Sequence, residues 1–218
     1  NPSELVSIHA RLAGYFEKQQ KDLELDDKAS YASETWRELE VEKVYHLLSE
    51  QPNINFKPVL NAFLQAYRWR WRFAGNIIQV CQQASYEIGS KDAQQNVEIL
   101  TKLHQAYDKK EYDEFIDQAT LISSRNDLSA IAKIALLNRR GEAFRITNKF
   151  EKALADLDEV ITLDNKYVLA FINRGMTYRQ MKKYDQALLD FDQAITLDNT
   201  RASVFAGRGY TYQLMSKY

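Results

Sequence analysis

The sequence predicts an all-helical (all-α) fold, in which an N-terminal helical bundle continues into a right-handed solenoid of stacked helical hairpins. Three observations support this prediction. Only seven glycines and three prolines interrupt the 218 residues, which are rich in Ala, Leu, Gln, Glu and Lys. Apolar residues recur at three- and four-residue spacing along most of the chain. A segment near the C-terminus is repeated with a period of about 34 residues, which is typical of helix–turn–helix repeats.

Residues 1–100 are predicted to form a helical bundle or linker domain of four or five helices. Four apolar stripes run through this region, and each marks one face that a helix must bury. Breaks between them fall near residues 25–30, 50–58 and 89–92. The stripes consist of Leu5, Ile8, Leu12, Tyr15 and Phe16; of Val41, Val44, Tyr45 and Leu48; of Leu60, Phe63, Leu64 and Tyr67; and of Ile77, Val80, Cys81, Ala84 and Ile88.

The strongest signal in the sequence is the internal repeat. The dipeptide Arg-Gly occurs at residues 140–141, 174–175 and 208–209, so that successive copies are equally spaced, one period apart. The segment that starts at Arg139 also aligns without a gap on the segment that starts at Asn173. Each copy has the apolar spacing of two helices. Chance does not produce an agreement of this length, so we expect two copies of one hairpin.

Small residues stand where the two helices of each hairpin must touch. Gly141 and Gly175 allow the second helix to approach the first, and Ala153 and Ala187 lie opposite them. With these features the chain resembles the tetratricopeptide repeat family over residues 134–218, as two full repeats and the first helix of a third. The resemblance implies a solenoid whose first helices line a concave groove.

The same resemblance implies a protein or peptide partner in that groove. A non-catalytic scaffold or sensor module is therefore the function that we expect. By the family pattern, the groove residues are Asn138, Glu142, Arg145, Ile172, Asn173, Met176, Arg179, Ala206, Tyr210 and Gln213.

Some members of the family grip the C-terminus of a peptide with a set of Lys, Asn and Arg side chains. Asn173 matches one position of this set. Glu142, Ser203 and Gly207 stand at positions where Asn, Lys and Arg would be expected. A clamp for a chaperone tail is therefore not expected here.

Residues 101–133 have two interpretations. The segment at residues 109–119 is similar to the one at residues 182–194, and the apolar residues before it fit a partner helix. This similarity favours a degenerate tetratricopeptide repeat. However, the spacing from Tyr112 to Phe150 is longer than the repeat period, and no glycine stands at the contact position. Both a degenerate repeat and an unrelated helical segment stay open.

A second resemblance concerns residues 5–50. The segments IHARLAGYFEKQ and WRELEVEKVYHLLSE resemble the helical region that follows the winged helix in bacterial STAND-type signalling ATPases. This resemblance implies that the chain is the sensor arm of such a protein, with the ATPase N-terminal to it. The chain itself has no GxxxxGK[ST] loop for nucleotide phosphates. The resemblance rests on His9, Leu12, Ala13, Tyr15, Trp36, Arg37, Glu42, Tyr45, His46 and Leu47.

The overall composition gives no general reason to expect a nucleic-acid or membrane partner, so any such contact would have to be a local patch. The formal net charge is −1, which gives no general electrostatic attraction to nucleic acid or to an anionic membrane. One cysteine cannot form an internal disulfide, and no segment has the roughly 20 apolar residues of a membrane span. We therefore expect a cytoplasmic protein. The chain begins with Asn1 and stops at Tyr218 inside a repeat, so we also expect a fragment of a longer protein.

One basic and aromatic patch supports an alternative function. Arginines and aromatic residues alternate in this segment, and such side chains can pair with phosphates and stack on bases. The alternative is therefore a nucleic-acid or phosphorylated-ligand site. The competing interpretation is that the tryptophans pack between helices while the arginines reach solvent. The patch consists of Arg68, Trp69, Arg70, Trp71 and Arg72.

No catalytic residue, cofactor or metal site is predicted. His9, His46 and His104 are far apart in the sequence and lack metal-binding spacing, and we expect His46 and His104 to be buried imidazoles. Cys81 lies on an apolar stripe and is predicted to be a core residue. The carboxylates of the second repeat helices are predicted to face solvent; these are Asp156, Asp158, Glu159, Asp190 and Asp192.

Overall fold

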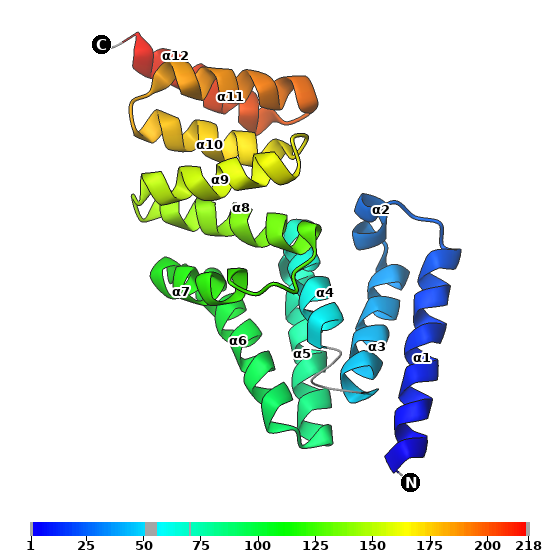
Figure 1. The fold of residues 1–218 in the computed structure, drawn as a ribbon. Helices are drawn as coiled ribbons and strands as arrows, with labels where there is room; N and C mark the ends of the chain where they lie inside the picture. Colours follow the sequence, from blue (N-terminus) through cyan, green and yellow to red (C-terminus); the bar gives the residue numbers. More distant parts are fainter. Residues whose placement is uncertain (1, 51–55, 70, 217–218) are drawn as a thin grey trace. The chain divides into compact units, whose positions relative to one another are not determined.

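The chain is helical, and the residues that the structure describes contain no strand (Figure 1). The computed structural model describes residues 2–50, 56–69 and 71–216, without the side chains of residues 2, 27, 28, 67–69 and 71. Two compact units are formed. The first comprises Asn1–Lys110 and Ser124–Ala135, and the second comprises Glu111–Ser123 and Leu136–Tyr218. The prediction of an all-helical fold is confirmed. None of the described helices is long and apolar enough to cross a membrane.

The first unit is a bundle arranged around one central helix. Helix α3 packs against α1 on one side and against α4 and α5 on the other, and α6 packs on α5 (Figure 1). The short helix α2 begins after Asp26, whose carboxylate accepts a hydrogen bond from the backbone N–H of Ala29 at 2.7 Å. The helices are α1 (Pro2–Asp22), α2 (Asp27–Ala32), α3 (Glu34–Glu50), α4 (Phe56–Trp69), α5 (Trp71–Ile88) and α6 (Lys91–Asp108).

Most of the predicted apolar stripes of this unit form its core. Val44, Leu48, Phe63, Ile77 and Cys81 are all fully buried. The stripe of α1 is an exception, and here the prediction is wrong. Its members Leu5, Ile8, Leu12 and Tyr15 are exposed, because α1 contacts α3 through a neighbouring face that carries Ala13, His9 and Gln20.

The second unit is a stack of helices joined by short turns. Helices α9, α10, α11 and α12 pack consecutively, each against the next (Figure 1). The pairs α8/α9 and α10/α11 are the two predicted hairpins, and α12 is the first helix of the third. The helices are α7 (Tyr112–Ser123), α8 (Ala130–Ile146), α9 (Phe150–Leu163), α10 (Val168–Gln180), α11 (Tyr184–Leu197) and α12 (Ala202–Met215).

The two repeat glycines lie at the closest approach within each hairpin, as predicted. A Cβ atom on Gly141 would come within 3.4 Å of the backbone oxygen of Ala153, and one on Gly175 within 3.2 Å of that of Ala187. Real Cβ atoms rarely tolerate such contacts with backbone. The paired helices therefore meet at a distance that a larger residue would increase.

The turns between first and second helices share an unusual conformation. Asn148 and Lys182 have φ angles of 58° and 59° at equivalent positions of the two hairpins. Lys110, between α6 and α7, has a φ of 61°. Residues other than glycine seldom adopt this left-handed region. The turn at Lys110 therefore has the local geometry of a repeat turn, and the degenerate repeat at residues 101–133 stays a prediction.

Candidate functional site

The first helices of the hairpins form one continuous surface in the second unit. Asn173 Nδ2 on α10 donates a hydrogen bond to Asn138 Oδ1 on α8 at 3.1 Å. Arg179 Nη1 on α10 donates to the backbone oxygen of Gly207 on α12 at 3.2 Å. These bonds join α8, α10 and α12 side by side. We call the surface formed by the ten predicted groove residues on these helices the first-helix face.

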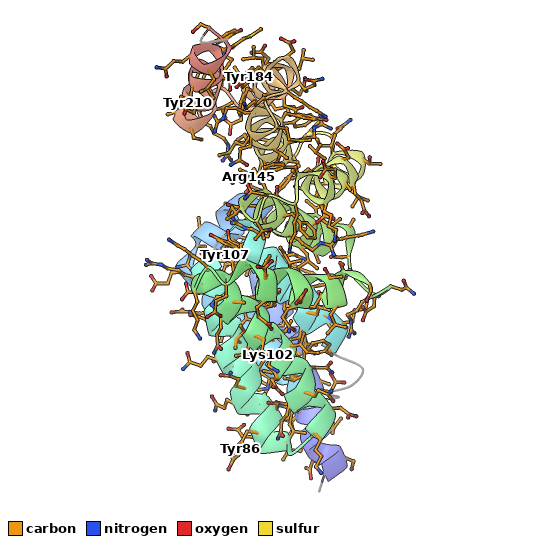
Figure 2. All side chains as sticks on the ribbon, turned by 90° about the vertical axis from the view of Figure 1, so that its left-hand side faces the viewer. Tyr86, Lys102, Tyr107, Arg145, Tyr184 and Tyr210 are labelled. Carbon is orange, nitrogen blue, oxygen red and sulfur yellow. The ribbon has the colours of Figure 1, made fainter. Side chains whose placement is uncertain are left out.

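Two arginines and a tyrosine form the most distinctive part of this face. Arg145 and Arg179 occupy the same position in successive repeats, and both are half-buried. The guanidinium carbon of Arg179 lies 5.1 Å from the ring centroid of Tyr210, within the range of a cation–π contact. Arg145 and Tyr210 are labelled on the stack in Figure 2. The face thus carries two cations on neighbouring helices.

The two guanidinium groups influence each other electrostatically. Burial lowers the pKa of Arg179; the Tyr210 hydroxyl opposes this effect, and the positive charge of Arg145 adds to it. Both side chains stay protonated at neutral pH, because an arginine pKa is far above 7. The positive charge of Arg145 therefore acts on Arg179 across two adjacent first helices.

The other predicted residues of the face differ in their exposure. Asn138 is buried at 2% exposure, so it supports Asn173 instead of offering its own amide to a ligand. Arg139 Nη1 forms an ion pair with the Glu142 carboxylate at 3.1 Å, which offsets its negative charge. Half-buried apolar side chains lie at Ile172 and Met176, against the core of the second hairpin. The residues exposed to solvent are Ala206, Tyr210 and Gln213.

Buried ion pairs fix each hairpin from inside. Arg140 binds both carboxylate oxygens of Asp156, at 2.7 Å each, and Arg174 binds both oxygens of Asp190 at 2.9 and 2.7 Å. Asp156 and Asp190 are only 6% and 5% exposed. The prediction that these two carboxylates face solvent is therefore wrong. A carboxylate can be buried here because a two-pronged guanidinium neutralises it.

Arg140, Arg174 and the equivalent Arg208 also form hydrogen bonds to the helix that precedes their own hairpin. Arg174 Nη1 donates to Asp158 on α9 at 2.6 Å, and Arg208 Nη1 donates to Asp192 on α11 at 2.8 Å. Arg140 Nη1 donates to the Ser123 hydroxyl on α7 at 2.6 Å. We call this series of bonds the arginine ladder. It connects successive hairpins and thereby fixes the spacing of the first helices.

Sequence reasoning missed the buried ion pairs within the hairpins, although one signal for them was present. The arginine before a repeat glycine is followed by an aspartate at the same offset in both hairpins, as Arg140 is by Asp156 and Arg174 by Asp190. The Arg-Gly dipeptide drew attention to the glycine alone. A constant offset between a cation and an anion on two antiparallel helices is the pattern that could have revealed the pair.

The alternative basic and aromatic patch lies largely outside the described side chains. Of its five members Arg68, Trp69, Arg70, Trp71 and Arg72, only Arg72 has a described side chain, and it is exposed at the start of α5. A nucleic-acid site at this position stays a prediction.

His46 and His104, which were predicted to be buried, are only half-buried, and they have distinct surroundings. The Nδ1 atoms of His9 on α1 and His46 on α3 lie 2.7 Å apart, so one ring donates a hydrogen bond to the other. The pairing of these two residues, which are distant in the sequence, was not predicted. His104 lies edge-on to the ring of Phe63. Within the described part of the chain, no three His, Cys, Asp or Glu residues form a group that could hold a metal ion.

Cys81 lies in the core, as its apolar stripe predicts. It is fully buried, and burial raises the pKa of its thiol to about 12. A thiol that is not ionised near neutral pH is a poor nucleophile. This residue therefore has a packing role in α5.

A groove of about 450 Å³ lies between α3 and α5 in the first unit. Its α3 wall carries Glu34, Glu38 and Glu42, one helical turn apart, and its α5 wall carries the amides of Asn76 and Gln79. Arg37 also lines the groove, so its lining contains both carboxylates and a guanidinium. The groove supports no specific assignment.

The class of protein defined by the second unit is an α-solenoid of helical hairpins with a polar and apolar first-helix face. Its family follows from comparison with known families. Models described as tetratricopeptide repeat match residues 134–167 and 168–200. These residues are tetratricopeptide repeats, and the predicted family is confirmed. Repeats of this family are generally non-catalytic scaffolds for protein interactions.

Several solved structures are similar to part of this chain. One is the TPR domain of Arabidopsis OM64, at 22% identity and a TM-score of 0.47, covering 53% of this chain and 92% of that one. Another is the first TPR of Spaghetti (RPAP3) bound to the HSP90 peptide SRMEEVD, at 19% identity and a TM-score of 0.48, covering 54% and 90%. A comparison with curated protein sequences finds no match.

Proposed function

We propose that this chain is a non-catalytic scaffold that binds an acidic segment of a partner protein on its first-helix face. The observation that carries this proposal is the pair Arg145 and Arg179 on adjacent first helices, with the ring of Tyr210 against the Arg179 guanidinium. The scaffold function follows from the family of residues 134–200. The preference for an acidic segment follows from the two cations.

The chemistry of the face suits a peptide with both charged and apolar side chains. Carboxylates of the ligand would pair with the two guanidinium groups, and arginine favours such two-pronged contacts. Ile172 and Met176 offer half-buried apolar surface on α10, the helix that carries Arg179, and Tyr210 is 51% exposed. The amide of Asn173 can bond a peptide backbone. Together these groups recognise an extended acidic segment that carries apolar residues.

The test uses fluorescent decapeptides that alternate Glu with Leu, Gln with Leu, or Lys with Leu. We expect the Glu peptide to bind most tightly, and the charge-reversal variant Arg145→Glu/Arg179→Glu to weaken its binding at least about tenfold, roughly 1.4 kcal/mol. Fluorescence anisotropy measures the dissociation constants. Arg201→Glu is the matched control for each of the single variants Arg145→Glu and Arg179→Glu, because it changes the net charge by the same amount; Arg201 pairs with Asp198 in the turn before α12 and is not one of the ten residues of the face.

Two results would contradict the proposal. The double variant and Arg201→Glu could bind the acidic peptide equally well, which would place the binding site elsewhere. Alternatively, the Gln and Glu peptides could bind the unaltered chain equally, which would remove the role of the two cations. Far-UV circular dichroism of each variant verifies that the helices are retained.

We also propose that this scaffold is the sensor arm of a STAND-type signalling protein. Support comes from the resemblance of residues 5–50 to the helical region of those proteins. Several residues of that resemblance lie together in the α1/α3 contact, including His9, Ala13, Tyr45 and His46. The test is the gene sequence upstream of this segment. A GxxxxGK[ST] loop followed by a winged helix would support the assignment, and a different upstream domain would refute it.

A further inference from the structure

Helix α1 exposes an apolar stripe along most of its length. Leu5, Ile8, Leu12 and Tyr15 are 59%, 39%, 36% and 55% exposed. Their alternating three- and four-residue spacing is that of the core positions of a coiled coil. A helix with an uncovered stripe of this kind normally packs against another helix. The described part of the first unit leaves the stripe uncovered.

This exposed stripe is separate from the face that docks α1 on α3. The docking face carries His9, Ala13, Phe16 and Gln20; Ala13 and Gln20 are buried, and Gln20 Nε2 donates to the Glu40 carboxylate on α3 at 2.6 Å. At about 100° per residue, the two rows lie roughly 90° apart around the helix. Helix α1 can therefore remain on α3 while the exposed stripe contacts another helix.

A row of charges borders the stripe on the side away from α3. It consists of Glu4, Arg11 and Lys18, which follow one another at heptad spacing and are all exposed. The row begins with a carboxylate and ends with an ammonium group. It is therefore complementary to a copy of itself that runs in the opposite direction, with Arg11 at the centre.

We propose that two copies of this chain associate through their α1 helices, packed antiparallel and stripe against stripe. Ile8 of one copy then lies against Leu12 of the other, and Leu5 lies against Tyr15. Glu4 of each copy approaches Lys18 of the other, which gives two ion pairs across the two-fold axis. A parallel pair would keep Glu4 and Lys18 apart.

The charge row also contains one opposing contribution. Near the two-fold axis, Arg11 of each copy lies beside its counterpart, and this like-charge contact weakens the association. The two ion pairs between Glu4 and Lys18 outnumber this single repulsive contact. The apolar stripe supplies the affinity, and the charge row determines the direction in which the helices run.

The test measures oligomeric state by sedimentation velocity at protein concentrations from about 1 to 200 μM. We expect the unaltered chain to shift from monomer to dimer across this range, and Leu12→Glu to abolish the dimer. Leu189→Glu is the matched control, since Leu189 is 70% exposed on α11, far along the chain from the stripe. It should dimerise like the unaltered chain. Leu12 is 36% exposed, and far-UV circular dichroism of Leu12→Glu verifies that the monomer keeps its helices.

Charge exchange tests the direction of the helices. Glu4→Lys alone should weaken dimerisation roughly tenfold, because it turns both ion pairs into repulsions. Glu4→Lys/Lys18→Glu should restore it, because the exchanged charges meet again in an antiparallel pair. A chain that stays monomeric at the highest concentration, a dimer that survives Leu12→Glu, or an exchange that fails to restore association would each overturn the proposal.

Discussion

Asp156 and Asp190 occupy positions where the amphipathic pattern of a second repeat helix predicts solvent. Both are instead buried carboxylates held by two prongs of an arginine. The hydrogen bonds to Asp190, ahead of the opposing effect of burial, raise the pKa of Arg174 and keep it charged. Each pair is stable only as a pair, because either group alone would be an uncompensated charge in a poorly solvated place.

Removal of one partner should therefore be costly. We expect Arg174→Met to lower the free energy of unfolding by about 3 kcal/mol, because it leaves the Asp190 carboxylate buried without its counter-charge. Urea unfolding followed by far-UV circular dichroism gives this value. The second change in Arg174→Met/Asp190→Leu removes that carboxylate and should recover a large part of the loss.

Arg208 provides the control at the equivalent repeat position. Its pair with Asp192 has 34% and 52% exposed side chains, against 21% and 6% for Arg174 and Asp190. Arg208→Met should cost less than about 1 kcal/mol, as is usual for solvated ion pairs. Equal losses at the two positions would show that burial of the carboxylate is not what makes the Arg174 pair important.

We expect the histidine pair to make the first unit sensitive to acid. Burial lowers the pKa of His46, the charge of His9 lowers it further, and Glu42 opposes both. A histidine with a lowered pKa in the folded state favours the neutral form. Its contribution to stability is complete above the ordinary value of about 6.5, and it is lost as the pH falls through the lowered pKa. Protonating both rings would also set two N–H donors against each other.

We therefore expect the urea midpoint to be lower at pH 5.5 than at pH 7.5, and His46→Gln to reduce this difference. The neutral amide cannot take up the proton that destabilises the pair. The pH dependence of His104→Gln is measured for comparison, because burial also lowers the pKa of His104. A pH dependence that is unchanged by His46→Gln would exclude the pair as its source.

At the scale of helices, the repeat glycines give a matched comparison. A Cβ atom on Gly175 would lie 3.1 Å from Phe191 and 3.2 Å from the backbone of α11, whereas one on Gly209 would meet nothing within 4 Å. Gly175→Ala should therefore destabilise the chain by about 1–3 kcal/mol through overpacking. Gly209→Ala should be neutral or stabilising by up to about 1 kcal/mol, because alanine favours a helix. Urea unfolding of both variants measures the contrast.

The opposite ranking would show that α10 and α11 can separate at little cost. In that case the small residues would not set the distance between the helices. An inert outcome at both positions would lead to the same conclusion.

The helices of the repeats could be predicted from sequence because their pattern is redundant. Gly141 and Gly175 mark the contact, large apolar residues surround it, and the segment occurs twice. Helix α1 shows the reverse case. It carries an exposed row with Leu12 and a docking row with Ala13, and the docking row is the less hydrophobic. Helix α1 contacts α3 through the pair His9 and His46 and the hydrogen bond from Gln20 to Glu40. Hydrophobic periodicity cannot predict such polar contacts.

At the scale of the whole molecule, the repeat spacing predicted which residues share the candidate surface. It did not predict how far each side chain is buried or what it contacts. Arg145 and Arg179 could be placed on one face because they are one repeat period apart. The burial of Asn138 could not be foreseen, since it depends on the contact of its amide with Asn173 on the next first helix. Contacts between hairpins follow from how closely they stack, and a linear sequence does not state that distance.

The binding proposal and the dimer proposal concern different units of the chain. Arg145→Glu/Arg179→Glu should leave the oligomeric state unchanged, and Leu12→Glu should leave peptide affinity unchanged. The two sets of variants therefore serve as controls for each other, with anisotropy and sedimentation as independent measurements.

The arginine ladder has a consequence for how such an array can lengthen during evolution. Arg174 takes its buried counter-ion, Asp190, from its own hairpin, and only a solvated carboxylate, Asp158, from the one before. A tandem duplication of one hairpin therefore inserts a unit whose buried aspartate is already paired with an arginine of the same unit. For the charge of its arginine, the new copy needs from the preceding hairpin only a surface aspartate, which the duplicated segment itself supplies.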